Sequence, residues 1–170
     1  MKGNSMLMAV AFVGVTYGML GEEESAIAQL LVTHRIPAAL AVEAVGEAVA
    51  VCAKQGYAET AVLVDADGVK QALLRGDGTG AHSLDSAAGK AYTSATLKAD
   101  TQAVVQRAKT DPIIASVIAK LPGMLLDGGG VVIKLNGEVI GAIAASGAPA
   151  GEIDENCARA GLEEIRSRLQ

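Results

Sequence analysis

Aromatic residues are scarce in this chain of 170 residues, where they make up 2% of the sequence, with no Trp and a single Phe. A ligand pocket would therefore be walled by aliphatic side chains and glycine backbone rather than by stacked rings. Basic runs with interleaved aromatics are also lacking, and the net charge is −5. These absences argue against a nucleic-acid partner, which needs positive charge to meet the phosphates.

Cysteine is rare as well: the chain has only Cys52 and Cys157. No Cys-x-x-Cys pair and no Cys/His cluster occurs, which argues against a structural zinc site and against covalent attachment of c-type haem. Both cysteines fall in predicted helices among apolar residues. They could pair in an oxidising compartment, but two buried free thiols are the interpretation favoured by the sequence.

The one long uncharged, mostly apolar run is N-terminal, from Met6 to Leu20, after Lys2. It is too short for a comfortable transmembrane helix. Ala26-Ile27-Ala28 then supplies a small-x-small pattern, so residues 1–28 are predicted to be a cleaved signal peptide. The mature chain, residues 29–170, would be periplasmic or secreted and keep no membrane span. The alternative is an uncleaved N-terminal helix that packs on a neighbour.

The remaining length suits a single domain, with 51% hydrophobic residues, many of them Ala and Val. Two hairpins are expected, one across Ala66-Asp67-Gly68 and one at Asn136-Gly137. Helices are expected at 36–55, 83–97, 101–109 and 153–169, strands at 60–65, 69–74, 131–135 and 138–146, and residues 111–121 are ambiguous between loop and short helix. The pattern predicts an α+β fold in which an antiparallel or mixed sheet of about five strands is flanked by helices.

A glycine-rich loop, Arg75–Gly80, precedes the predicted helix that Ser83 would cap. Free backbone N–H groups at such a helix start favour an anion. The Gly76-x-Gly78-x-x-Ala81 spacing matches the dinucleotide fingerprint only superficially. The strand before it belongs to a hairpin and no parallel strand follows, so NAD binding is rejected.

Several side chains around this helix have ligand chemistry. His82 and the more N-terminal His34 are interpreted as exposed residues whose imidazoles could ligate iron. The Tyr92 phenolate could ligate haem iron or pack in the core. Lys90 and Arg75 could receive carboxylates such as haem propionates, or be ordinary surface charges.

Acidic residues begin the last predicted helix. Glu152 and Glu155 lie three residues apart, with Asp154 between them. Their carboxylates could bind iron or another hard cation. Complementing the helix dipole is the simpler role, and the one favoured on physical grounds.

Seven motifs in order make the chain similar to the GlcG/HbpS haem-binding (haem-degrading) family. They cover nearly all of the chain from about residue 36. They are VDADG at 64–68, LRGDGTG at 74–80, SAAGKAYT at 86–93, LPG at 121–123, GGG at 128–130, GEVIGAI at 137–143 and SGAPAGEIDENCARAG at 146–161.

The resemblance implies a profilin-like α+β domain that assembles into homo-oligomers, octamers in the best-known extracellular member. It also implies non-covalent haem binding, with slow, non-canonical haem breakdown in some members. The Thr of the family's K-A-[FY]-T motif is the proposed haem contact, which gives that role to Thr93, with Lys90 and Tyr92 beside it. Glu152 and Glu155 are the counterpart of acidic residues that collect iron.

The function predicted is that of an exported haem-binding protein that sequesters haem and slowly degrades it with release of iron. The affinity expected is micromolar rather than nanomolar, a difference of about 4 kcal/mol, because the two histidines fall in loop-like positions. Any enzymatic activity would be limited to that slow breakdown. The alternative is an accessory protein of a metabolic operon, whose ligand is a small organic anion such as a hydroxy acid, or a corrinoid.

Overall fold

Four strands form one antiparallel sheet at the centre of the molecule, in the order β2-β1-β4-β3. The computed structural model describes residues 32–169, so the predicted signal peptide lies outside the described residues. The strands are β1 (Thr60–Asp65), β2 (Lys70–Arg75), β3 (Gly130–Leu135) and β4 (Glu138–Ser146). The α+β class is as predicted, but the sheet has four strands rather than five among these residues.

Each hairpin forms where the turn chemistry predicts it. Asn136 and Gly137 both have positive φ, +49° and +87°, as a tight two-residue turn between antiparallel strands requires. Gly68 closes the first hairpin with φ +81°. The two hairpins then join through β1 and β4, which pair antiparallel from Thr60 opposite Ser146. This central pairing brings together segments about 80 residues apart in the chain.

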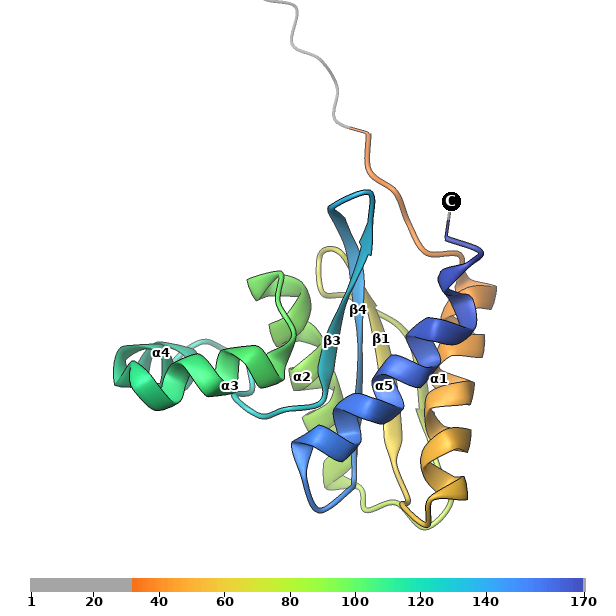
Figure 1. Ribbon diagram of the computed structural model, residues 1–170, viewed down its shortest axis with the longest axis horizontal. Coiled ribbons are helices and arrows are strands. Elements are labelled where there is room, and N and C mark those ends of the chain that lie inside the picture. Colours follow the sequence, from red (N-terminus) through yellow and green to blue (C-terminus); the bar gives the residue numbers. More distant parts are fainter. Residues whose placement is uncertain (1–31, 170) are drawn as a thin grey trace, which may run out of the picture. The chain divides into compact units, whose positions relative to one another are not determined.

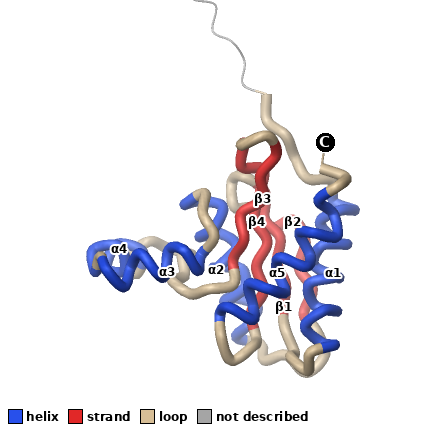
Figure 2. Tube along the Cα trace, in the orientation of Figure 1, coloured by secondary structure: helices blue, strands red, loops and turns tan. Residues whose placement is uncertain are grey.

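Helices cover both faces of the sheet (Figure 1; Figure 2). Helices α1 (Ala38–Lys54) and α5 (Gly151–Arg166) lie side by side on one face, and α2 (His82–Leu97) lies on the other. Successive side chains of a strand point to opposite faces, so Leu63 of β1 packs under α1 and α5 while Val62 packs under α2. The central strands β1 and β4 are thus buried on both sides, whereas the edge strand β2 is mostly exposed.

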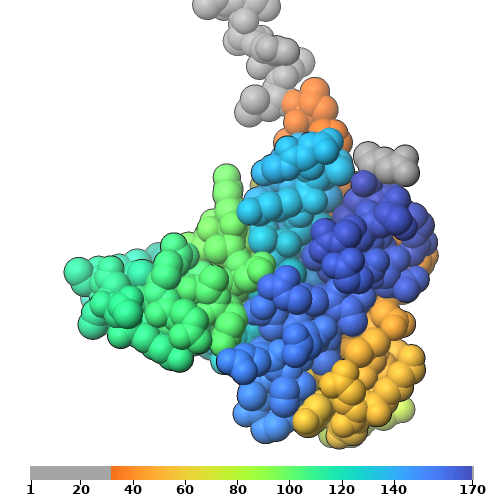
Figure 3. Space-filling model, in the orientation of Figure 1, coloured from red at the N-terminus to blue at the C-terminus, as the bar shows by residue number. Residues whose placement is uncertain are grey.

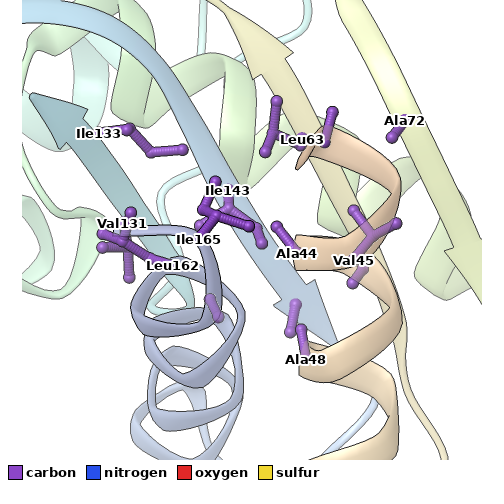
Figure 4. Packing of buried hydrophobic residues seen from close by; sticks show 14 of the residues in the cluster. Ala44, Val45, Ala48, Leu63, Ala72, Val131, Ile133, Ile143, Leu162 and Ile165 are labelled. Atoms are coloured by element: carbon purple, nitrogen blue, oxygen red, sulfur yellow. The ribbon is translucent and has the colours of Figure 1, made fainter. Parts of the chain in front are cut away.

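The core between the sheet and the helix pair combines branched side chains with alanine (Figure 4). Leu63 and Ile143 of the sheet meet Ala44 of α1 and Ile165 of α5, all fully buried. Gly161 allows this close packing, because a methyl group there would collide with the backbone carbonyl of Ala44. The core on the α2 side is built largely of alanine, so α2 also lies close to the sheet.

Two short helices extend from the rest of the molecule as an arm (Figure 1; Figure 3). They are α3 (Thr101–Thr110) and α4 (Pro112–Ile118). The stretch that the sequence left ambiguous is therefore helical over α4, with Pro112 as its first residue and Asp111 accepting a hydrogen bond from Ile113 N as its cap. No helix within residues 32–169 is long and apolar enough to cross a membrane.

Candidate functional site

The exposed side of α2 borders a surface pocket of about 390 Å³. One wall is α2 itself, and the others are the β1–β2 turn and the loop after α4. This α2 pocket is lined by Gly68, Lys70, Asp85, Ala88, Gly89, Tyr92 and Gly123. Its volume falls in the range of small-molecule sites, and its surface is mainly apolar with one ammonium, one carboxylate and one phenol.

Tyr92 is the aromatic residue of this pocket, and its ring lies between two glycines. A methyl group at Gly68 would come within 2.5 Å of ring carbon Cδ2, and one at Gly123 within 3.6 Å of the other edge. Both glycines have positive φ, +81° and +79°. The absence of side chains on each side leaves the ring half-buried, so Tyr92 is not the core residue of the alternative interpretation.

Thr93 is fully buried, next to Tyr92 on the helix. Its hydroxyl oxygen accepts a hydrogen bond of 2.8 Å from the backbone N–H of Leu125. That bond fixes the loop that carries Gly123 against α2. The contribution of Thr93 to the pocket is thus to hold one wall in place, because its own side chain is closed off from a ligand.

Lys90 is buried, which corrects the expectation of an ammonium exposed to a ligand. It is 1% exposed, and its Nζ lies 2.6 Å from Asp154 Oδ2 on α5 and 2.8 Å from Asp127 Oδ2. The side chain passes Gly129, where a methyl group would stand 3.1 Å from Lys90 Cδ and 2.8 Å from Asp154 Cβ. Lys90 therefore links the helix layers on the two sides of the sheet through a buried ion pair.

A second buried carboxyl lies beside this ion pair. Glu59, the residue before β1, is 1% exposed. Burial and, less strongly, the Asp154 carboxylate raise its pKa to about 8, against the opposing effect of Lys90. Burial also raises the pKa of Asp154, again against the effect of Lys90. Glu59 is thus mostly protonated at neutral pH.

Cys52 and Cys157 form a disulfide, so the prediction of two free thiols is wrong. Their Cα atoms are 5.7 Å apart, a normal distance for the bond. The sequence placed both in helices among apolar residues, as the structure does, but α1 and α5 pack face to face only in the folded chain. Cys52 Sγ also lies 3.0 Å from Glu59 Oε1.

The start of α2 is closed rather than open to an anion. The helix begins at His82, and Ser83 lies fully buried within its first turn instead of capping it. The Ser83 hydroxyl donates to Gly80 O and lies 2.6 Å from Thr60 Oγ1. Arg75 donates from Nε to Thr79 O at 2.8 Å and so fixes the glycine-rich loop. His82 is exposed, as expected, but does not line the α2 pocket.

The two glutamates considered as metal ligands are engaged by other side chains. Glu155 Oε1 lies 2.7 Å from Arg159 Nη2, and Glu152 Oε1 accepts a hydrogen bond from Gln102 Nε2. Within residues 32–169, Cys52, Glu59 and Cys157 also lie close together, but the two sulfurs are joined in the disulfide and offer no thiolate to a metal. His34 is exposed and pairs with Glu138, with 2.6 Å between Nδ1 and Oε2.

Sequence reasoning missed Lys70, Glu59 and Asp127. Lys70 follows the Asp-Gly turn by two residues, so the sequence shows that it lies near that turn. The sequence does not show that the turn packs beside α2. The partners of Lys90 left a weak signal in the sequence. Lys90 lies in the middle of a helix and has no acidic residue three or four positions away, which indicates a partner distant in the chain.

Comparison with known proteins is consistent with this geometry. A family model described as "Haem degrading protein HbpS-like" matches residues 36–163. The crystal structure of HbpS is 31% identical with a TM-score of 0.74, covering 81% of this chain and 94% of that one. A double mutant of HbpS from Streptomyces reticuli is 30% identical with a TM-score of 0.74, covering 93% and 99%.

The crystal structure of a PduOC–haem complex shares the fold at 21% identity, with a TM-score of 0.71 over 78% of this chain and 96% of that one. No curated protein matches the sequence.

Proposed function

The chain belongs to the HbpS-like haem-degrading family, and from that premise we propose that it binds haem non-covalently in the α2 pocket. The observation that carries the assignment is the combination in one pocket of the Tyr92 phenol, the Lys70 ammonium and glycine backbone. A phenolate is a known protein ligand of ferric haem iron. An ammonium at the rim suits a propionate.

The residues of the α2 pocket fit the flat shape of haem. Gly68 and Gly123 flank the Tyr92 ring, so backbone rather than side chains borders it. The pocket is open to solvent, and about 390 Å³ admits part of a macrocycle with the propionates outside. Bound haem would supply the iron chemistry, while Tyr92 would hold the iron and Lys70 would orient the propionate edge.

Haem titration of the purified mature chain tests the proposal. We expect a saturable, shifted Soret band, and we expect Tyr92→Phe to weaken binding at least about tenfold, or about 1.4 kcal/mol. Tyr57→Phe is the matched control, because it removes a phenol from a different depression. Equal spectra and affinities for wild type and Tyr92→Phe would show that Tyr92 is not the iron ligand.

Thr93 gives a second, independent test. Thr93→Val removes the hydroxyl that holds Leu125 N but keeps the volume of the side chain. If Thr93 positions the pocket wall, this variant weakens haem binding but keeps the wild-type Soret position, whereas loss of the iron ligand would move the band. An unchanged affinity would mean that the loop needs no such anchor.

The proposal extends to slow haem breakdown and to export. The family description supports breakdown, which would appear as peroxide-dependent bleaching of the bound Soret band faster than that of free hemin. The N-terminal sequence pattern supports export. Finding the first residue of the protein near Gln29 after secretion would support cleavage, and an intact N-terminus would contradict it.

We also infer that the chain assembles with copies of itself through the arm. An apolar groove of about 310 Å³ runs along α3 and α4, and Ile113 is 69% exposed on it. Ile113→Asp should lower the mass found by light scattering. Val42→Asp, on a valine of α1 that is 61% exposed, is the control and should leave the mass unchanged. A wild-type chain of monomer mass would contradict the assembly.

A further inference from the structure

The Cys52–Cys157 disulfide differs from a simple structural crosslink in having a carboxyl group against it. Cys52, Cys157 and Glu59 are each no more than 1% exposed. Their ligand atoms all lie within 4.8 Å of one another, with Glu59 Oε1 3.0 Å from Cys52 Sγ. The charged groups next to Glu59 are Asp154 and Lys90.

A buried carboxyl next to the disulfide lowers the stability of the fold, which a purely structural crosslink would not require. Burying a polar group without partners is unfavourable, and apolar side chains would pack against the sulfurs equally well. Oxidised sulfurs carry no hydrogen, so they donate nothing to Glu59 Oε1, and Oε2 accepts no hydrogen bond within the described residues. In the dithiol state, the Cys52 thiol would donate to Oε1. Glu59 is therefore better satisfied when the cysteines are reduced.

A surface depression of about 320 Å³ reaches the Glu59 side of this cluster. Glu59 is part of its lining, together with Val49 and Ala53 of α1 and with Gly76 and Asp77 at the end of β2. The sulfurs themselves are fully buried. A protein redox partner could not reach the buried sulfurs directly, so the reagents would have to be small molecules such as hydrogen peroxide or a small dithiol.

We propose that Cys52 and Cys157 are a reversible redox couple in the folded protein, oxidised by hydrogen peroxide and reduced by a small dithiol, with Glu59 as the group that takes and returns the Cys52 proton. No haem is needed for this reaction, so it stands apart from haem binding.

In the oxidation, the ionised form of Glu59, which becomes populated as the pH approaches its pKa of about 8, takes the thiol proton, and the Cys52 sulfur attacks one peroxide oxygen. The O–O bond breaks, the leaving hydroxide takes that proton to become water, and Cys52 becomes a sulfenic acid. The Cys157 sulfur then attacks the Cys52 sulfur, the S–O bond breaks, and a second water leaves as the disulfide forms. Two thiols lose two electrons and two protons, and the peroxide becomes two waters. A dithiol reverses the change by two thiol–disulfide exchanges, ending as its own disulfide, with Glu59 giving its proton to Cys52.

The test uses the haem-free mature chain, in which these two residues supply every thiol. We expect dithiothreitol to release two thiols while circular dichroism shows a folded protein, and one equivalent of peroxide to restore the disulfide. Glu59→Gln should slow the peroxide step about 100-fold, the effect of losing a proton-transfer group. Asp77→Asn, a carboxylate in the same depression, is the control and should react at the wild-type rate.

Three results would overturn the proposal. The first is a disulfide that yields thiols only after urea unfolds the chain, which would make it a permanent crosslink. The second is a Glu59→Gln variant that oxidises as fast as wild type. Cys157→Ser provides a check that does not depend on Glu59: peroxide should leave a sulfenic acid on Cys52 that dimedone traps, and the absence of an adduct would also reject the mechanism.

Discussion

The buried Glu59 carboxyl should make the stability of the fold depend on pH. Its pKa is raised from 4.5 to about 8 in the folded protein. Between these values the folded state holds a proton that the unfolded state has released, so the free energy of unfolding falls as pH rises. The contribution is fully present below about pH 4.5 and is lost as pH rises through about 8.

Glu59→Gln isolates this contribution, because the amide has the shape and the donor capacity of the protonated carboxyl but does not titrate. Each pH unit in the window corresponds to about 1.4 kcal/mol. Wild type and variant should thus unfold within about 1 kcal/mol of each other at pH 5, whereas at pH 7.5 the variant should be more stable by about 4 kcal/mol. Asp154, Lys90 and Asp127 stay in place in both proteins.

Urea unfolding of the oxidised proteins, followed by circular dichroism at half-unit pH steps, measures the difference. The other titratable groups are common to both chains, so their effects on stability cancel in the comparison. Glu47→Gln, on a half-buried glutamate of α1, reports the effect of the amide substitution alone. Parallel curves for wild type and Glu59→Gln would refute the conclusion that folded Glu59 is protonated at neutral pH.

Three further changes test the packing. Lys90→Met leaves Asp154 buried without its ammonium and should cost about 3–5 kcal/mol in urea unfolding, with partial recovery on adding Asp154→Asn; a wild-type midpoint would mean that the ion pair contributes nothing. Gly161→Ala forces α5 away from α1 and should lower the free energy of unfolding by about 1–3 kcal/mol in the same assay. An unchanged free energy would show that the two helices are not in close contact there. Cys157→Ala removes a crosslink between positions 105 apart and should lower the free energy of unfolding by about 4–5 kcal/mol under oxidising conditions. An equal loss in reduced wild type would confirm that the missing crosslink is the cause, and no loss would contradict it.

Local chemistry explains what could be predicted from the sequence. The hairpin turn at Asn136 and Gly137 depends on residues that accept positive φ, and the helices follow from spacing of apolar positions within a single element. Pairing of β1 with β4 joins two hairpins far apart in the chain, and no local pattern encodes it. The class of fold was therefore predictable, whereas the strand count was not.

The residues of the candidate site could likewise be predicted only in part. Tyr92 was identified from its residue type and motif, and the structure places it in the α2 pocket. Lys90 was assigned to a ligand because its partner, Asp154, lies 64 residues away. Ser83 looked like a helix cap by its type, but the helix begins one residue earlier and Thr60 occupies the other side of its hydroxyl. Type and spacing indicated which side chains matter, and only tertiary contacts showed what each one touches.

The segment from Lys90 to Thr93 has a consequence for how this protein can change. Within four residues, Lys90 reaches α5, Tyr92 enters the α2 pocket and Thr93 holds the loop at Leu125. Inserting or deleting one residue ahead of them in α2 would rotate all three by about 100° at once. A change in the length of α2 would therefore disrupt the fold together with the pocket. New ligand preferences would have to arise by substitution at fixed positions, and any redesign should leave the length of α2 untouched.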